Sequence, residues 1–195
     1  TPEAEPVQPL APSKPTDDEP AVRSPLGEDD GARFKRGRLI HTLLQTLPGL
    51  APDQREVTAQ TFLAEDRHTL SRDEQSDITQ ETLRIIVHPD FAFLFSPGSL
   101  AEVPLVAEID GTVISGQVDR LIVTEQTVAI VDYKTNRPPP QDAKDIAPVY
   151  LKQMAAYQAA LARIYPGKDI KGYLLWTDGP TLMPLDTDRL TPYAP

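Results

Sequence analysis

Two aspartates and one lysine are the residues in this sequence whose types and spacing could do chemistry. Asp119 lies in the segment Gly116–Arg120, and Asp132 and Lys134 lie in the segment Val131–Asn136. Any one of them alone would most simply be a solvated residue at a strand end. Because Asp and Lys are depleted in strands, three of them interrupting apolar segments at compatible spacing favour a functional site.

The chemistry that this set could support is metal-dependent cleavage of a phosphodiester bond. Side chains that face the same way on adjacent strands come close together, and two carboxylates at short range repel each other unless a cation lies between them. Mg²⁺ prefers such oxygen ligands, together with water and substrate phosphate. Lys134 shares a strand face with Asp132 because side chains alternate, and a cation there could stabilise the charge that develops on the phosphate.

The strands that must position these residues are indicated by apolar, β-branched segments between turns. Residues 100–109 and 112–124 flank Asp110-Gly111, a dipeptide typical of a hairpin turn. Residues 127–134 follow after a short turn, 170–177 predict a fourth strand, and 181–185 are a candidate fifth strand. The first three strands form a predicted meander that carries both aspartates and the lysine.

Helical patterns precede and follow this meander. Apolar spacing predicts a helix over 32–47 that ends at Pro48-Gly49, a second from Pro52 to about His68, and a third from the capping box at Ser71 to about His88. The helical front covers about 32–95, and a further helix is predicted over 145–165. This order predicts an α/β (α+β) domain with a central mixed sheet flanked by helices.

Residues 1–30 differ from the rest in composition, being rich in Pro, Glu, Asp and Ala, with eight acidic and two basic residues. We expect a disordered linker there, a tether to an upstream domain of a longer protein, and one folded domain over 31–195. The formal net charge of −10 lies mostly in this segment. The chain alone is therefore expected to bind DNA poorly without a metal or a partner.

The absence of cysteine excludes a disulfide framework, a cysteine zinc site and an iron–sulfur cluster. It fits a reducing compartment. The longest apolar segment is too short to cross a bilayer, so we expect no membrane association.

Four motifs in order resemble the RecB-like branch of the PD-(D/E)XK nuclease superfamily. That branch pairs a G-x-x-D strand with a D-Y-K-T strand, which here are Gly116–Asp119 and Asp132–Thr135. A later helix carries Q-x-x-x-Y, here Gln153–Tyr157, and an early helix carries a histidine, here His41. The resemblance extends over about 34–177 and implies a restriction-endonuclease-like central sheet.

The resemblance also implies roles for individual residues. Asp119 and Asp132 would bind Mg²⁺, or Mn²⁺ in its place, with the backbone carbonyl of Tyr133 and the side chain of His41 as further ligands. Lys134 would orient or activate the attacking water and stabilise the transition state. Taken alone, His41 on an apolar helix would more simply be a core histidine.

Four further residues are candidates for site support or DNA contact. Gln153 and Tyr157 are four apart and share a helix face, where they would contact the metal site or the DNA backbone. Glu102 matches a family position before the hairpin, although a plain salt bridge is an equal alternative. Arg38 belongs to a basic run at 33–38 that could contact phosphates, or could be a solvated helix face. Trp176 is expected in the core.

Within this branch, the sequence is most similar to the C-terminal nuclease domain of AddA-type helicase–nuclease subunits. The similarity implies a Mg²⁺-dependent exonuclease that hydrolyses single-stranded DNA from unwound duplex ends, in double-strand break repair and recombination in the bacterial cytoplasm. An AddB-type partner subunit is implied, and ATP-dependent helicase activity would lie outside this chain, which has no Walker motif. Two alternatives stay open: a non-catalytic module that guides DNA or holds a partner subunit, and a stand-alone nuclease acting on duplex DNA.

Overall fold

A computed structural model of the chain describes residues 30–195, with side chains described from Phe34 onward. The linker expected over 1–30 therefore lies outside the described residues, except for Asp30. The first part of the described chain is helical, as predicted. Its elements are α1 (Asp30–Thr46), η1 (Leu47–Gly49), α2 (Pro52–Leu63), η2 (Asp66–His68), α3 (Arg72–Ile86) and η3 (Pro89–Phe95).

The second part holds a five-stranded sheet with strand order β1-β2-β3-β4-β5. The first three strands form the predicted antiparallel meander, β3 pairs with β4 in parallel, and β5 pairs antiparallel with β4. This confirms the predicted α/β class with a mixed sheet. The elements are β1 (Leu100–Ile109), β2 (Thr112–Val123), β3 (Thr127–Lys134), η4 (Ala143–Asp145), α4 (Pro148–Ile164), β4 (Asp169–Trp176), β5 (Thr181–Leu185), α5 (Thr187–Leu190) and η5 (Thr191–Tyr193).

The turn between β1 and β2 explains why the hairpin could be predicted so closely. Asp110 and Gly111 have φ values of 47° and 82°. Both are in the left-handed region that a two-residue hairpin turn requires and that Asp-Gly readily adopts. The turn fixes the register of the pair, in which Ile109 lies opposite Thr112.

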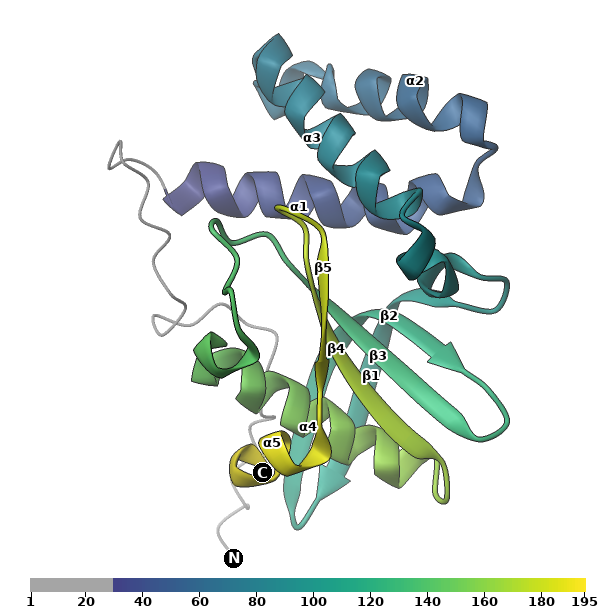
Figure 1. Cartoon of the computed structure of the whole chain (residues 1–195), viewed down its shortest axis with the longest axis vertical. Coiled ribbons are helices and arrows are strands. Elements are labelled where there is room, and N and C mark those ends of the chain that lie inside the picture. Colours follow the sequence, from purple (N-terminus) through teal and green to yellow (C-terminus); the bar gives the residue numbers. More distant parts are fainter. Residues whose placement is uncertain (1–29) are drawn as a thin grey trace, which may run out of the picture.

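Two hydrophobic cores lie on the two faces of the sheet (Figure 1). The helix α4, with α5 beside it, packs on one face, and α1 lies across the other with α2 and α3 stacked beyond it. Side chains of β3 alternate between them: Val128 and Ile130 belong to the α4 core, and Val131 and Tyr133 to the core shared with the N-terminal helices. Trp176 is buried in the α4 core, as expected.

Two helix boundaries differ from the predicted ones. The second helix ends at Leu63 rather than near His68. Asp66–His68 instead form the separate 3-10 turn η2, which ends at Thr69 in the left-handed region at φ 45°. The fourth helix begins at Pro148 rather than at Asp145, because proline is favoured in the first helical turn. No described helix is long and apolar enough to cross a membrane.

Candidate active site

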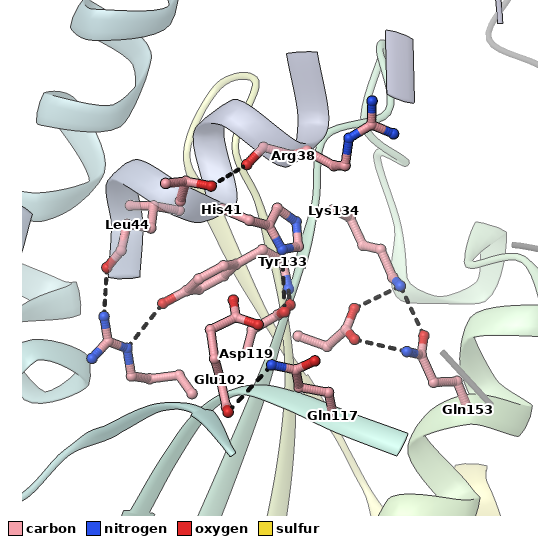
Figure 2. Close-up of polar contacts among 12 residues, drawn as sticks. Arg38, His41, Leu44, Glu102, Gln117, Asp119, Tyr133, Lys134 and Gln153 are labelled. Carbon is pink, nitrogen blue, oxygen red and sulfur yellow. Dashed lines mark hydrogen bonds and ion pairs between the residues drawn. The ribbon is translucent and has the colours of Figure 1, made fainter. Parts of the chain in front are cut away.

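The site lies where β2 and β3 separate. Their last paired residues are Arg120 and Val131. Beyond this pair, the backbone N–H of Tyr133 donates to the side-chain oxygen Oδ2 of Asp119 at 2.6 Å. Asp119 is buried, and the splayed strand ends leave its other oxygen directed at α1 (Figure 2).

Three potential metal ligands converge at this point. His41 of α1 lies with its Nδ1 3.1 Å from Asp119 Oδ1, and Glu102 of β1 approaches from the other side (Figure 2). Ligand atoms of His41, Glu102 and Asp119 all lie within 4.8 Å of one another. One imidazole and two carboxylates are a donor set suited to a divalent cation such as Mn²⁺ or Mg²⁺, so these residues fit the expected metal.

The backbone of Glu102 is strained. Its φ is 52°, a left-handed value that a non-glycine residue in a strand rarely adopts. Val103 and Ala101 on either side keep their pairing with β2, whereas Glu102 itself has no ladder partner. The break in the ladder places the Glu102 carboxylate with His41 and Asp119, which is the kind of site at which backbone strain persists.

A second group of side chains surrounds Lys134, which is buried on the α4 side of β3. Its Nζ lies 2.6 Å from Asp132 Oδ2 and donates to Gln153 Oε1 at 2.9 Å. Gln153 in turn donates from Nε2 to Asp132 Oδ1 at 2.9 Å. The Nζ also lies 4.1 Å from the ring centroid of Tyr150, a cation–π contact. Lys134 is therefore held in one position by three side chains.

The electrostatics of the site depend on these contacts. Burial disfavours a charged imidazole, but the charge of Asp119 and its hydrogen bond outweigh this and raise the pKa of His41 to about 9. Burial raises the pKa of Asp132, and the Asp119 carboxylate adds to that shift. The pKa of Asp119 is lowered despite burial by the charge and hydrogen bond of His41 and by the Tyr133 N–H. Without a cation, the protonated His41 imidazole thus stabilises the ionised form of Asp119.

Two further residues support the strands rather than the cluster itself. The Tyr157 hydroxyl donates to Gln117 O at 3.0 Å, and Gln117 Nε2 donates to Glu102 O at 3.3 Å. Arg120 is buried, with its Nε donating to Tyr133 Oη at 3.2 Å and its Nη2 to Leu44 O of α1 at 2.5 Å. These bonds connect the site strands to α4 and to α1.

A comparison with protein families decides the relationship. The model of the PD-(D/E)XK nuclease superfamily matches residues 20–183. The chain belongs to the PD-(D/E)XK nuclease superfamily. The mixed sheet flanked by helices has the restriction-endonuclease-like arrangement expected for that superfamily.

One of three similar solved structures shares the fold, at low sequence identity. The crystal structure named "Putative exonuclease" from Eubacterium rectale has a TM-score of 0.57 and 14% identity, covering 85% of this chain and 63% of that one. The chain thus spans less than two thirds of that protein. The structure of SSO0001 matches with a TM-score of 0.36 and 17% identity, covering 82% of this chain and 81% of that one. Protein VC1899 from Vibrio cholerae matches with a TM-score of 0.30 and 11% identity, covering 85% of this chain and 50% of that one. No curated protein matches the sequence significantly.

Most of the PD-(D/E)XK residues predicted from the sequence meet at the site, whereas Tyr157 supports a strand and Arg38 lies apart. The structure brings His41, Glu102 and Asp119 together in one cluster, and Asp132, Lys134 and Gln153 in the adjacent network. Metal binding by Asp132 and by the Tyr133 carbonyl stays a prediction. Arg38 is exposed on α1, and Figure 2 shows its guanidinium directed away from the carboxylates.

Sequence reasoning missed two supporting residues and misjudged part of the basic run. Tyr150 lies one helical turn before Gln153 on the same face, a spacing that could have indicated it. Glu81 falls on the buried stripe of α3 and pairs with Arg36, so that arginine is neither a free phosphate ligand nor a solvated side chain. Lys35 donates to Thr69 Oγ1 at 2.7 Å.

Proposed function

We propose that this domain hydrolyses phosphodiester bonds of DNA with a divalent cation, Mg²⁺ or Mn²⁺. One observation carries the proposal: the three-ligand cluster of His41, Glu102 and Asp119 adjoins a buried lysine held beside a second aspartate. Membership of the PD-(D/E)XK nuclease superfamily supports it.

The site residues would have different roles in this hydrolysis. His41, Glu102 and Asp119 would hold the cation, with Asp132 and the Tyr133 carbonyl as further ligands. A divalent ion at such a site supplies Lewis-acid polarisation of a phosphate oxygen and activation of the attacking water. The Lys134 ammonium group would orient that water and stabilise the charge on the phosphate in the transition state.

We further propose that the substrate is single-stranded DNA from unwound duplex ends, cleaved as an exonuclease within an AddA-type helicase–nuclease of the bacterial cytoplasm. The sequence motifs that contain Asp119, Asp132 and Gln153 support this assignment, which implies a role in double-strand break repair and recombination. ATP-dependent helicase activity would belong to a part of the protein outside this chain. An AddB-type partner would supply DNA contacts that a chain of net charge −10 provides poorly.

The decisive experiment measures cleavage of end-labelled single-stranded DNA in Mg²⁺, in Mn²⁺ and in EDTA. The wild-type chain should cleave only with a divalent ion, and Asp119→Asn should lose both cleavage and Mn²⁺ binding. Wild-type protein that binds DNA but cleaves none with either metal would overturn the proposal in favour of a non-catalytic module. A duplex substrate cleaved as fast as the single strand would instead remove the single-strand preference.

Lys134 provides a sharper test of mechanism. Lys134→Gln should lower kcat by about 10²- to 10³-fold, the effect expected for a preorganised transition-state donor, while Mn²⁺ affinity measured by calorimetry changes little. Lys152→Gln, at an exposed position of the same helix that carries Gln153, is the matched control and should cleave normally. Equal cleavage rates for Lys134→Gln and wild type would remove Lys134 from the mechanism.

A further inference from the structure

A carboxylate with no exposed surface lies outside the ligand cluster. Glu81 of α3 is completely buried, yet it carries two ion pairs. Arg36 Nη1 lies 3.4 Å from Glu81 Oε1, and Arg36 Nη2 and Arg137 Nη2 both donate to Oε2. A charge at zero exposure is costly unless it is paired and hydrogen-bonded, so this pairing must hold whenever the domain is folded.

The two arginines lie close in sequence to residues of the candidate site. Arg36 lies on α1, five residues before His41, and Arg137 follows β3, three residues after Lys134. Arg137 Nε also lies 3.5 Å from Asp178, just beyond the end of β4. Glu81 therefore joins the helix that carries His41 to the strand ends that carry the network of Lys134.

A second contact shows how closely α1 meets that strand end. A Cβ atom added to Gly37 would lie 2.9 Å from Thr135 Oγ1, closer than real Cβ contacts. The backbone N–H of Thr177 in turn donates to Lys134 O at 2.9 Å. Helix α1 therefore packs tightly against the end of β3 at Gly37, the residue next to Arg36, which pairs with Glu81.

The charges of this group argue for a connecting role rather than a phosphate site. Arg36 and Arg137 are balanced by Glu81 and Asp178, so the group has no net charge to offer an anion. Burial by itself would raise the pKa of Glu81, but the hydrogen bond from Arg36 and the charges of both arginines lower it. The pairing therefore stays ionic at neutral pH.

We propose that Glu81 is a positioning residue for the metal centre, which fixes α1 against the end of β3 through Arg36 and Arg137 so that His41 meets Asp119. The importance of Glu81 for metal binding rests on the proposed function. Its effect on the position of α1 does not, because the contact between His41 and the site strands can be measured without metal.

The first test uses the edge-on contact of the His41 and Tyr133 rings, whose centroids are 5.5 Å apart. An NMR cross-relaxation peak between the two rings is recorded in the metal-free chain. Arg36→Gln, which removes only the α1 side of the pairing, and Glu81→Gln should each reduce this peak at least twofold. Because Arg36 is partly exposed, Arg36→Gln decides the test if Glu81→Gln fails to fold.

Two controls separate positioning from general stability. Lys35→Gln removes the neighbouring charge of α1 and its bond to Thr69, but no link to the strand ends. Leu63→Ala opens the core of the same helical layer at a fully buried position, with no polar contact to the site. Both should keep the ring–ring peak, although Leu63→Ala lowers the melting temperature.

Mn²⁺ titration by calorimetry supplies the second readout. Arg36→Gln should weaken Mn²⁺ binding about 10- to 100-fold, as for loss of a residue that orients a ligand, and both controls should bind as wild type does. Wild-type peak intensity in Arg36→Gln, or an equal loss in Leu63→Ala, would overturn the inference. A wild-type chain that shows the peak but binds no Mn²⁺ would refute the metal centre alone, and the ring–ring comparison would still decide the role of Glu81.

Discussion

At the residue scale, Glu102 combines a strained backbone with a carboxylate held near another carboxylate. Its φ of 52° is unfavourable for any residue with a Cβ, and burial together with the Asp119 charge raises its pKa. Both features cost folding free energy in the absence of a cation. A bound divalent ion would offset the second by neutralising the carboxylates.

Replacing Glu102 by glycine should therefore stabilise the metal-free fold and weaken the proposed metal centre. Glu102→Gly removes the left-handed strain and the repulsion with Asp119, so the free energy of unfolding should rise by about 1 kcal/mol. Mn²⁺ affinity should fall at least tenfold. Denaturant unfolding and calorimetry measure the two effects.

The matched control is Asp110→Gly, at φ 47° in the β1–β2 turn and away from the ligand cluster. It also replaces a left-handed residue by glycine, and it should leave Mn²⁺ affinity unchanged. If Glu102→Gly binds Mn²⁺ as tightly as wild type, Glu102 is not a ligand and its backbone conformation needs another explanation.

At the element scale, the approach of α1 to β3 can be tested with one methyl group. In an open helix, Gly→Ala gains stability through helix propensity. At Gly37 the added carbon would lie 2.9 Å from Thr135 Oγ1, and overpacking of this kind costs about 1 to 3 kcal/mol. Gly37→Ala should therefore lower the free energy of unfolding by about 1 kcal/mol net, measured by denaturant titration.

Combining Gly37→Ala with Thr135→Ala removes the opposing hydroxyl and should recover most of that loss. Gly49→Ala is the control, because nothing lies within 4 Å of a Cβ added there. Additive effects of the two substitutions at 37 and 135 would show that α1 does not contact the strand end as described.

The elements show which features of the fold local sequence can predict. The strand bounds at 100–109, 127–134 and 181–185 agree with the structure because alternation and the Asp110-Gly111 turn are local signals. The predicted start of the fourth helix is too early because residues 143–145 carry helical residue types but form a separate 3-10 turn. The Asp142 side chain caps that turn by accepting from the backbone N–H of Lys144.

The sequence could indicate only those site residues that belong to short motifs. Asp132 and Lys134 share a strand face, as their spacing indicated, and the Gln153 side chain contacts both. The pairing of Glu81 with Arg36 spans 45 residues and that with Arg137 spans 56. No local pattern specifies such contacts, and none indicates the left-handed conformation of Glu102 within β1.

At the scale of the whole molecule, His41 links stability to pH. Its pKa is raised from 6.5 to about 9 in the folded metal-free protein, so the folded state holds that proton more tightly than the unfolded state. The stabilisation is fully present below about pH 6.5, and it is lost as pH rises through 9. Glu81 and Asp119 have lowered pKa values, so their contributions are lost instead as pH falls into the acidic range.

The metal-free chain should therefore lose up to about 3 kcal/mol of unfolding free energy between pH 6.5 and 9, the equivalent of the His41 shift at 1.36 kcal/mol per pKa unit. His41→Gln should flatten this alkaline loss, and His88→Gln, at the start of η3, should not. Urea titrations at a series of pH values measure it.

Metal should reverse this dependence, because a cation binds the neutral imidazole and competes with its proton. Mn²⁺ affinity should rise with pH up to about 9, about tenfold per unit while one proton is displaced. Saturating Mn²⁺ should then stabilise the chain most where the metal-free protein is weakest. An Mn²⁺ affinity that is independent of pH between 6.5 and 9 would mean that the cation binds without displacing the His41 proton, and so without His41 as a ligand.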